Sequence, residues 1–267
     1  MMYIGGTSQF RCITAVTLAS LFAVLAGCRV DGQLRVSDDI ARRLPDEARN
    51  GGLALSDMAG FDSLLEGNDE SGDAAEEATF RVYLTPPRDV EDALTAKIAK
   101  GNAADEDLQP EDSRFQRART VDLDVPGGGD ALDFVGFDGG LEIRHDGTVG
   151  SFVSPKLLVF VAEDTVDNIY EEADGSEGAP SVQVSSVEVD RSLGPGDPVL
   201  ISLSEMVERG DEAFRILEQG RFQIAVVFGA GVRAENTDSE ISWPERVSWR
   251  ITDITLTLGV TPYAAFR

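Results

Sequence analysis

The acidic residues of one glycine-rich stretch have the chemistry to hold a hard cation. In "DVPGGGDALD" the carboxylates of Asp124, Asp130 and Asp133 stand beside three consecutive glycines. Carboxylate oxygens are the ligands that Ca²⁺ prefers, and extracellular modules bind this ion with dissociation constants of about 10⁻⁴ to 10⁻³ M. A second stretch, "DESGD", places Asp69, Ser71 and Asp73 at a ligand spacing. However, Ala74 replaces the turn glycine and Phe80 stands where the bidentate acid would be. We expect no cofactor. A structural Ca²⁺ is retained as an alternative.

A second group of acids has a spacing found at catalytic centres. In "EEADGSEG" the acids Glu172, Asp174 and Glu177 follow the pattern Glu-x-Asp-x-x-Glu. This pattern resembles the catalytic signature of configuration-retaining glycoside hydrolases of jelly-roll fold. The resemblance implies that residues two apart on a strand enter one cleft, where paired carboxylates cleave a glycosidic bond. The intervening Ala, Gly and Ser residues are poor strand formers and favour a solvated acidic loop. A secreted carbohydrate-active hydrolase is therefore the alternative function.

Two further motifs lack the context that their chemistry needs. Gly229, Gly231 and Ala234 in "AVVFGAGVRA" imitate a dinucleotide fingerprint, but the following "ENTDSEISWPE" does not have a helical pattern. We expect a glycine turn and no nucleotide. His145 is the only histidine and stands in "RHDGT", which predicts a surface turn. Because no Gly-x-Ser-x-Gly occurs in the chain, a nucleophile elbow is excluded, and we expect no catalytic residues.

The two tryptophans flank a proline in "ISWPERVSW". Trp249 shares the apolar phase of a predicted strand, which places it in the core. Trp243 precedes Pro244 in a predicted loop, so we treat it as a candidate platform for a glycan.

The charge of the chain limits its partners. Asp and Glu number 48 against 23 Lys and Arg, giving a net charge of −25. Nucleic acids and anionic lipid head groups are bound through basic patches, so we expect neither as a partner.

The first 28 residues carry the clearest signal. Arg11 is the only charge before Arg29, and residues 13–25 form an apolar core that is too short to span a bilayer. Leu25, Ala26, Gly27 and Cys28 then follow. This "LAGC" closely resembles the lipobox of bacterial lipoproteins. The resemblance implies cleavage before Cys28, a diacylglyceryl group on its thiol, and acylation of the new amine.

A lipid on Cys28 predicts where the protein resides. Two or three acyl chains on one residue anchor firmly, whereas one chain binds only marginally. We expect attachment to the membrane through Cys28 and a place in the cell envelope. In Gram-negative lipoproteins, Asp after the cysteine resembles an inner-membrane retention signal. Arg29 stands at this position. In a Gram-negative organism we therefore expect the outer membrane rather than the inner one.

Behind the signal the apolar residues repeat with a period of two. "TFRVYLT", "TVDLDV" and "RFQIAVVF" alternate as half-buried antiparallel strands do, and "KLLVFVA" is continuously apolar, as in a strand covered on both faces. The alternation changes phase near Ser185-Ser186 and near Thr252-Asp253, which predicts two β-bulges. Helical patterns interrupt the strands at residues 90–99 and 203–217. We expect a mainly β fold, namely an antiparallel, jelly-roll-like β-sandwich with a few short helices.

These observations predict three parts. Residues 1–27 are the signal peptide. Residues 28–78 form an acidic, flexible tether with possible short helices at 38–44 and 53–65. Residues 79–267 form the sandwich. We expect a non-catalytic lipoprotein that binds or displays a macromolecular partner, either an envelope protein or a glycan. A calcium-stabilised adhesion or assembly module is a further alternative.

Overall fold

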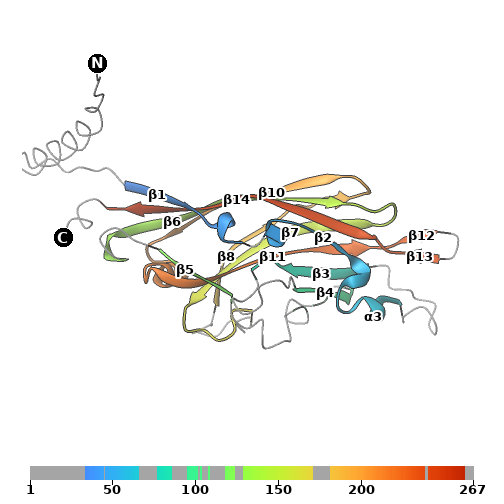
Figure 1. The fold of residues 1–267 in the computed structure, drawn as a ribbon, viewed down its shortest axis with the longest axis horizontal. Coiled ribbons are helices and arrows are strands. Elements are labelled where there is room, and N and C mark those ends of the chain that lie inside the picture. Colours follow the sequence, from blue (N-terminus) through green and yellow to red (C-terminus); the bar gives the residue numbers. More distant parts are fainter. Residues whose placement is uncertain are drawn as a thin grey trace, which may run out of the picture.

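The computed structural model describes residues 34–44, 46–65, 77–85, 95–101, 103, 108, 118–123, 129–170, 181–237 and 240–261. The described part is an antiparallel β-sandwich whose two sheets lie face to face along one long axis (Figure 1). None of its helices is long and apolar enough to cross a bilayer.

The first sheet, called sheet A, has five strands. They are β1 (Leu34–Asp39), β2 (Asn50–Ala54), β6 (Leu132–His145), β10 (Pro198–Glu208) and β14 (Arg246–Val260). Their order is β1-β14-β6-β10, and β2 pairs with β14 beyond the end of β1. Each pairing is antiparallel, so the inward side chains of alternate positions form one apolar face.

The second sheet, called sheet B, has seven strands in the order β4-β3-β11-β7-β8, with β5 beside β11 and β9 beside β7. They are β3 (Glu77–Tyr83), β4 (Thr95–Lys100), β5 (Arg119–Asp122), β7 (Ser151–Glu163), β8 (Ser181–Glu188), β9 (Ser192–Leu193) and β11 (Arg221–Arg233). A separate hairpin of β12 (Glu235–Thr237) and β13 (Glu240–Ser242) connects β11 to β14.

The strand order is that of a jelly roll. From β6 onward the chain passes from sheet A to β7 and β8 in sheet B, returns to β10, crosses to β11 and ends in β14. The orders β1-β14-β6-β10 and β3-β11-β7-β8 are the two four-stranded halves of an eight-stranded jelly roll. The expected antiparallel, jelly-roll-like sandwich is confirmed.

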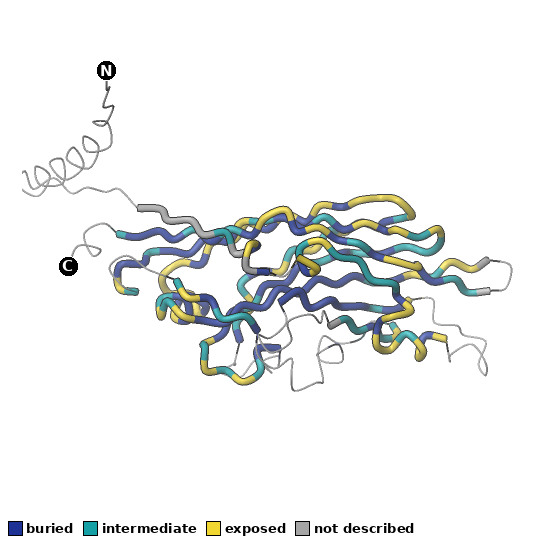
Figure 2. Tube along the Cα trace, viewed as in Figure 1, coloured by how far each residue is buried: buried dark blue, intermediate teal, exposed yellow. Residues whose placement is uncertain are grey.

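Aromatic side chains fill the space between the sheets. The Phe80 ring meets those of Phe152 and Phe228 edge to face, with centroids 5.5 and 5.8 Å apart. The Trp249 ring lies 5.2 Å from Phe228, and Trp249 is buried as predicted. Such pairs contribute about 0.5–1.5 kcal/mol beyond the burial of their area. In Figure 2 the buried residues follow the inner strands, and exposed residues gather at the turns and along the edge strand β10.

A second apolar cluster covers the outer face of sheet B. Tyr83, Leu158 and Val227 point to this face and pack beneath Ile169 and Tyr170. β11 is therefore buried on both faces over most of its length, although its alternating pattern predicted one exposed face. The continuously apolar stretch of β7 is covered on both faces, as expected.

Both predicted phase changes are β-bulges. The pairing of β14 with β6 shifts between Ile251 and Asp253, so Thr252 is the extra residue. The pairing of β8 with β7 shifts opposite Val159 and Phe160, so Val184 is the extra residue there, next to the predicted position. Each bulge returns the apolar residues that follow it to the inner face.

Residues 28–78 were predicted to form a flexible tether. Residues 34–65 of this range are instead part of the sandwich. Two of their segments, β1 and β2, pair with β14 in sheet A. Between and after these strands lie short helical turns, namely η1 (Ile40–Arg43), α2 (Asp46–Arg49), η2 (Leu55–Asp57) and α3 (Phe61–Leu65). Their residues Ala48, Leu55 and Leu64 are buried in the main core. The sandwich therefore begins at β1, because this segment supplies partners for the long last strand.

Of the two predicted helices, one is replaced by a strand and the other is shortened. Within residues 90–99 the described part is β4, whose pairing with β3 outweighs its helical pattern. Of residues 203–217 only α4 (Glu212–Leu217) is helical, and Met206 is an exposed residue of β10.

Candidate functional site

Several of the predicted site residues lie outside the described residues. Cys28, Asp124 and the acids Glu172, Asp174 and Glu177 are among them, as are Asp69 and Asp73. Asp130 and Asp133 are among the described residues. Asp130 is exposed, whereas the Asp133 carboxylate accepts a hydrogen bond from the Thr261 hydroxyl. Among the described residues no group of three or more His, Cys, Asp or Glu side chains is placed to hold a metal ion.

The prediction of an exposed Trp243 is wrong. Only 8% of this residue is exposed, and its side chain belongs to the main core. The loop after β13 closes one end of the sandwich, where Pro244 packs against the backbone of Gly150. A buried ring cannot act as a stacking platform for a glycan.

The prediction of a surface His145 is also wrong. His145 ends β6 and is buried, with its ring 5.1 Å from that of Phe152. Its Nε2 lies 3.1 Å from the Val149 carbonyl oxygen in the turn that follows. Burial lowers the pKa of His145 below its usual value of 6.5, although the Val149 carbonyl and the carboxylates of Asp146 and Glu245 oppose this shift. The turn exists as predicted, but it folds over the ring.

The predicted glycine turn at Gly229 and Gly231 is instead part of the second half of β11. Both glycines lie on the outer face of sheet B. At Gly229 a Cβ atom would stand 2.7 Å from the carbonyl oxygen of Phe80, which is too close. At Gly231 it would stand 3.4 Å from the carbonyl oxygen of Val153, an ordinary contact. The missing side chains leave a depression in the sheet.

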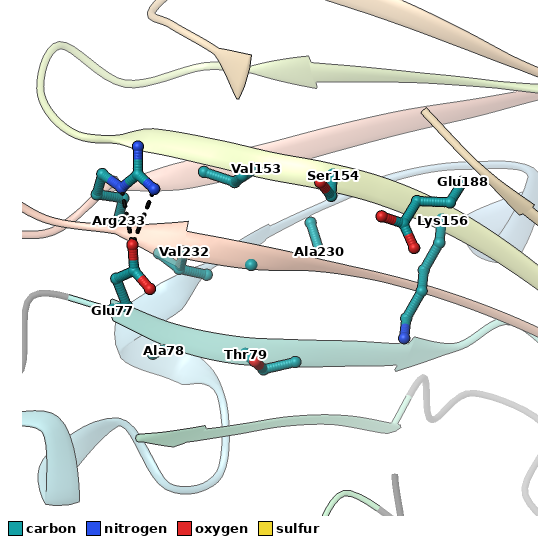
Figure 3. A pocket seen from close by; sticks show the side chains of 11 residues that line it. Glu77, Ala78, Thr79, Val153, Ser154, Lys156, Glu188, Ala230, Val232 and Arg233 are labelled. Atoms are coloured by element: carbon teal, nitrogen blue, oxygen red, sulfur yellow. Dashed lines mark hydrogen bonds and ion pairs between the residues drawn. The ribbon is translucent and has the colours of Figure 1, made fainter. Parts of the chain in front are cut away.

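A groove occupies this depression, and we call it the outer groove (Figure 3). Its volume is about 240 Å³, and it crosses β3, β11 and β7 to the edge of β8. Gly231 lies on its floor. Four charged side chains stand around it, namely Glu77, Lys156, Glu188 and Arg233.

The four charges stand at opposite sides of the groove, with Glu77 and Arg233 at one side and Lys156 and Glu188 at the other. The Nε and Nη2 atoms of Arg233 donate to one oxygen of Glu77 at 3.0 and 2.8 Å. Both side chains of this pair remain half exposed. Lys156 and Glu188 are cross-strand neighbours on β7 and β8. In Figure 3 the Lys156 side chain extends across β11, so the lysine lies over the groove rather than beside it.

A bulge in β7 shapes the side of the groove that this strand forms. The pairing of β11 with β7 shifts between Gly229 and Gly231, opposite Ser154 and Pro155. Ser154 has φ of 48°, the only positive value among the described residues other than glycine. Its N–H donates to the Arg191 carbonyl at 3.1 Å, which ties the bulge to the loop after β8. Non-glycine residues in this conformation are strained and cluster at functional sites.

The groups that line the groove can bind a polar ligand. These described groups do not combine a nucleophile with a neighbouring general base. The groove offers ammonium and guanidinium donors, two carboxylate acceptors and the hydroxyls of Ser154 and Thr79 around a short apolar floor. Sequence reasoning did not find the groove, because its residues come from four strands and Glu77 and Arg233 are 156 positions apart in the chain. The one available signal was the Gly-x-Gly spacing inside an otherwise apolar strand, which marks a close backbone approach.

Comparison with known proteins gives few similarities. No family model matches the sequence, and no curated protein matches it. One similar solved structure is that of infectious bursal disease virus Gx strain, with 10% identity and a TM-score of 0.29 over 54% of this chain and 27% of the other. Another is the T13 particle of the same virus, with 9% identity and a TM-score of 0.28 over 74% and 54%. This chain thus spans about a quarter to a half of those chains. Its jelly-roll fold is established by its own strand order.

Proposed function

We propose that this protein is a non-catalytic, lipid-anchored lipoprotein of the cell envelope, whose sandwich binds a macromolecular partner at the end far from the lipid. The "LAGC" motif ending at Cys28 supports the anchor. The absence of Asp at position 29, where Arg29 stands, supports the outer membrane in a Gram-negative organism.

The observation that carries the proposal is the position of β1. Leu34 begins this strand and pairs with Val260, so the chain enters sheet A at the end where β14 finishes. Leu34 is six positions after Cys28. At about 3.6 Å per residue this distance is at most about 22 Å. A lipid on Cys28 would hold that end of the sandwich near the membrane.

The outer groove then lies at the opposite end. β14 has 15 residues and extends for about 50 Å at about 3.3 Å per residue. Its first residues pair with His145, at the far end of β6, and β7 starts beyond the adjoining turn. The groove lies on the first residues of β3 and β7 and the last residues of β11 (Figure 1). This position presents the groove to partners away from the bilayer.

The anchor is tested by replacing the two cysteines separately. We expect Cys28→Ser to move the protein from the membrane fraction to the soluble fraction and to remove the acyl mass from the mature chain. Cys12→Ser is the matched control, because it changes a thiol within the predicted signal peptide and leaves Cys28 in place. Membrane retention of Cys28→Ser, or an unacylated wild-type Cys28 in mass spectrometry, would contradict the proposal.

The partner is tested by photo-crosslinking in intact envelopes. A crosslinking amino acid at Thr79, on the groove, is compared with one at Ser202, on the exposed face of β10. We expect a discrete crosslinked product from position 79 that position 202 does not give. Products from neither position, or the same products from both, would contradict binding at this end.

A further inference from the structure

The charges around the outer groove differ from those of the rest of the chain. Glu77 and Glu188 balance Lys156 and Arg233, so the groove is neutral in a protein of net charge −25. Lys156 is one of only three lysines in the sequence. The net negative charge of the chain attracts a cationic partner over long range. At contact, the groove can then pair with side chains of both signs.

The floor of the groove suits a polypeptide main chain. Gly231 has no side chain, and its neighbours Val153 and Ala230 are small or aliphatic. Glycine inside a strand often marks a place where another backbone approaches closely. The described lining contains no aromatic ring on which a sugar could stack. A polyanionic glycan would also be repelled by the net charge of the chain.

The spacing of the charges sets the spacing required of the ligand. Lys156 pairs with Gly229, and Gly229 is four positions from Arg233 along β11. At about 3.3 Å per residue the backbone positions that carry the two cations are therefore about 13 Å apart along the strand. A carboxylate on the ligand can reach the cation at one end of the groove, either Arg233 or Lys156. An ammonium group four positions away can then reach the carboxylate at the other end, either Glu188 or Glu77.

We infer that the outer groove binds a segment of a positively charged protein, which lays its main chain over Gly231 and places one acidic and one basic side chain, four positions apart, against the charged residues at the two ends of the groove. This inference rests on the proposed function, because it names the class of the macromolecular partner. It assigns the groove to polypeptide rather than glycan.

The test uses the full chain in detergent micelles and synthetic peptides of about eight residues, measured by isothermal titration calorimetry. The first peptide carries Lys and Asp four positions apart in a Ser/Val background, and its free N-terminus and amidated C-terminus give it a net positive charge. The second has the same composition with Lys and Asp adjacent. The third probe is an oligoglucuronate, which represents an acidic glycan. We expect binding of the first peptide, and at least about tenfold weaker binding of the second.

Variants place the binding at the groove. Gly231→Leu fills the floor at a position where a Cβ atom makes an ordinary contact, so the fold is retained. We expect this variant to bind the first peptide at least about tenfold more weakly than the wild type does. Glu77→Gln combined with Arg233→Gln should have the same effect. Ser202→Val, on the exposed face of β10, is the matched control and leaves binding unchanged.

Each contrary result overturns the inference. Unchanged binding to Gly231→Leu would place the peptide elsewhere. Equal binding of both peptides would show attraction by net charge alone. Binding of oligoglucuronate instead of peptide would assign the groove to a glycan, and no binding at about 1 mM of any probe would remove the site. Because the assay is carried out in micelles, it does not depend on the lipid: loss of anchoring contradicts the proposed function, whereas loss of peptide binding contradicts only this assignment.

Discussion

The indole Nε1 of Trp249 donates a hydrogen bond to the carbonyl oxygen of Ala48 at 2.9 Å, across 201 positions of the sequence. Both groups are buried. The bond fixes the short helix α2 against the last strand, so the first described residues form part of the same core as the final ones. Its loss would leave the Ala48 carbonyl buried without this donor.

Trp249→Phe should lower the free energy of unfolding by about 2–4 kcal/mol, because it removes both the hydrogen bond and part of a buried ring. Urea denaturation measures the change. Trp243→Phe is the matched control. It removes a similar volume from the core and leaves the bond to Ala48 in place, so it should have the smaller effect. Equal effects of the two variants would show that the hydrogen bond contributes nothing.

Gly51→Ala should destabilise the protein by about 1–3 kcal/mol, through overpacking. A Cβ atom at Gly51 would stand 2.3 Å from the Trp249 ring and 2.5 Å from the Glu47 carbonyl oxygen. The control is Gly231→Ala, where the same added methyl group makes only an ordinary contact. If residues 28–78 were a flexible tether, Gly51→Ala would leave the thermal midpoint unchanged, and that result would contradict the pairing of β2 with β14.

Ser154→Gly should raise the free energy of unfolding by about 1 kcal/mol. Glycine adopts the observed φ of 48° without the steric penalty that a Cβ atom brings. The reference is Ser202→Gly in the regular strand β10, which should instead lower stability by about 0.5–1 kcal/mol. Destabilisation by both substitutions would show that Ser154 is not strained.

The stability of the protein should fall as the pH is lowered below about 6.5. Burial lowers the pKa of His145 in the folded state, so the unfolded chain binds a proton more readily. The contribution of His145 is therefore complete above pH 6.5 and is lost as the pH falls from there towards the folded pKa, by at most about 1.4 kcal/mol per pH unit.

Two measurements check this pH dependence. Urea denaturation at several pH values should show a weaker loss between pH 6.5 and 5 for His145→Gln than for the wild type. Because the chain has a single histidine, its imidazole proton resonance can also be followed alone in the folded protein. A folded-state midpoint at or above 6.5 would contradict the prediction.

Patterns within one strand were readable from the sequence, and contacts between distant segments were not. The phase changes at Thr252 and beside Ser185 predicted bulges, because the inner face must stay apolar on both sides of an extra residue. β1 and β2 were missed because they are short and carry polar or glycine residues. Their structure depends on pairing with β14, about 200 positions later.

The site residues show the same division. The turn after His145 was predicted from its Asp-Gly pair, yet nothing local indicates that the turn covers the imidazole. Trp243 was expected in a loop, and it is; the loop itself closes the sandwich and buries the ring. The outer groove draws on four strands, so only the three-dimensional register brings Glu77, Arg233 and Lys156 together.

The pairing of β1 with β14 also determines how the protein resists force. The six residue pairs from Leu34–Val260 to Asp39–Thr255 lie along the long axis, and their hydrogen bonds run perpendicular to the strands. A pull applied at Leu34 along that axis loads the whole ladder in shear, so its bonds must break together rather than one at a time. The first strand is thus a mechanical clamp between whatever holds the N-terminal side and whatever pulls on the groove at the other end.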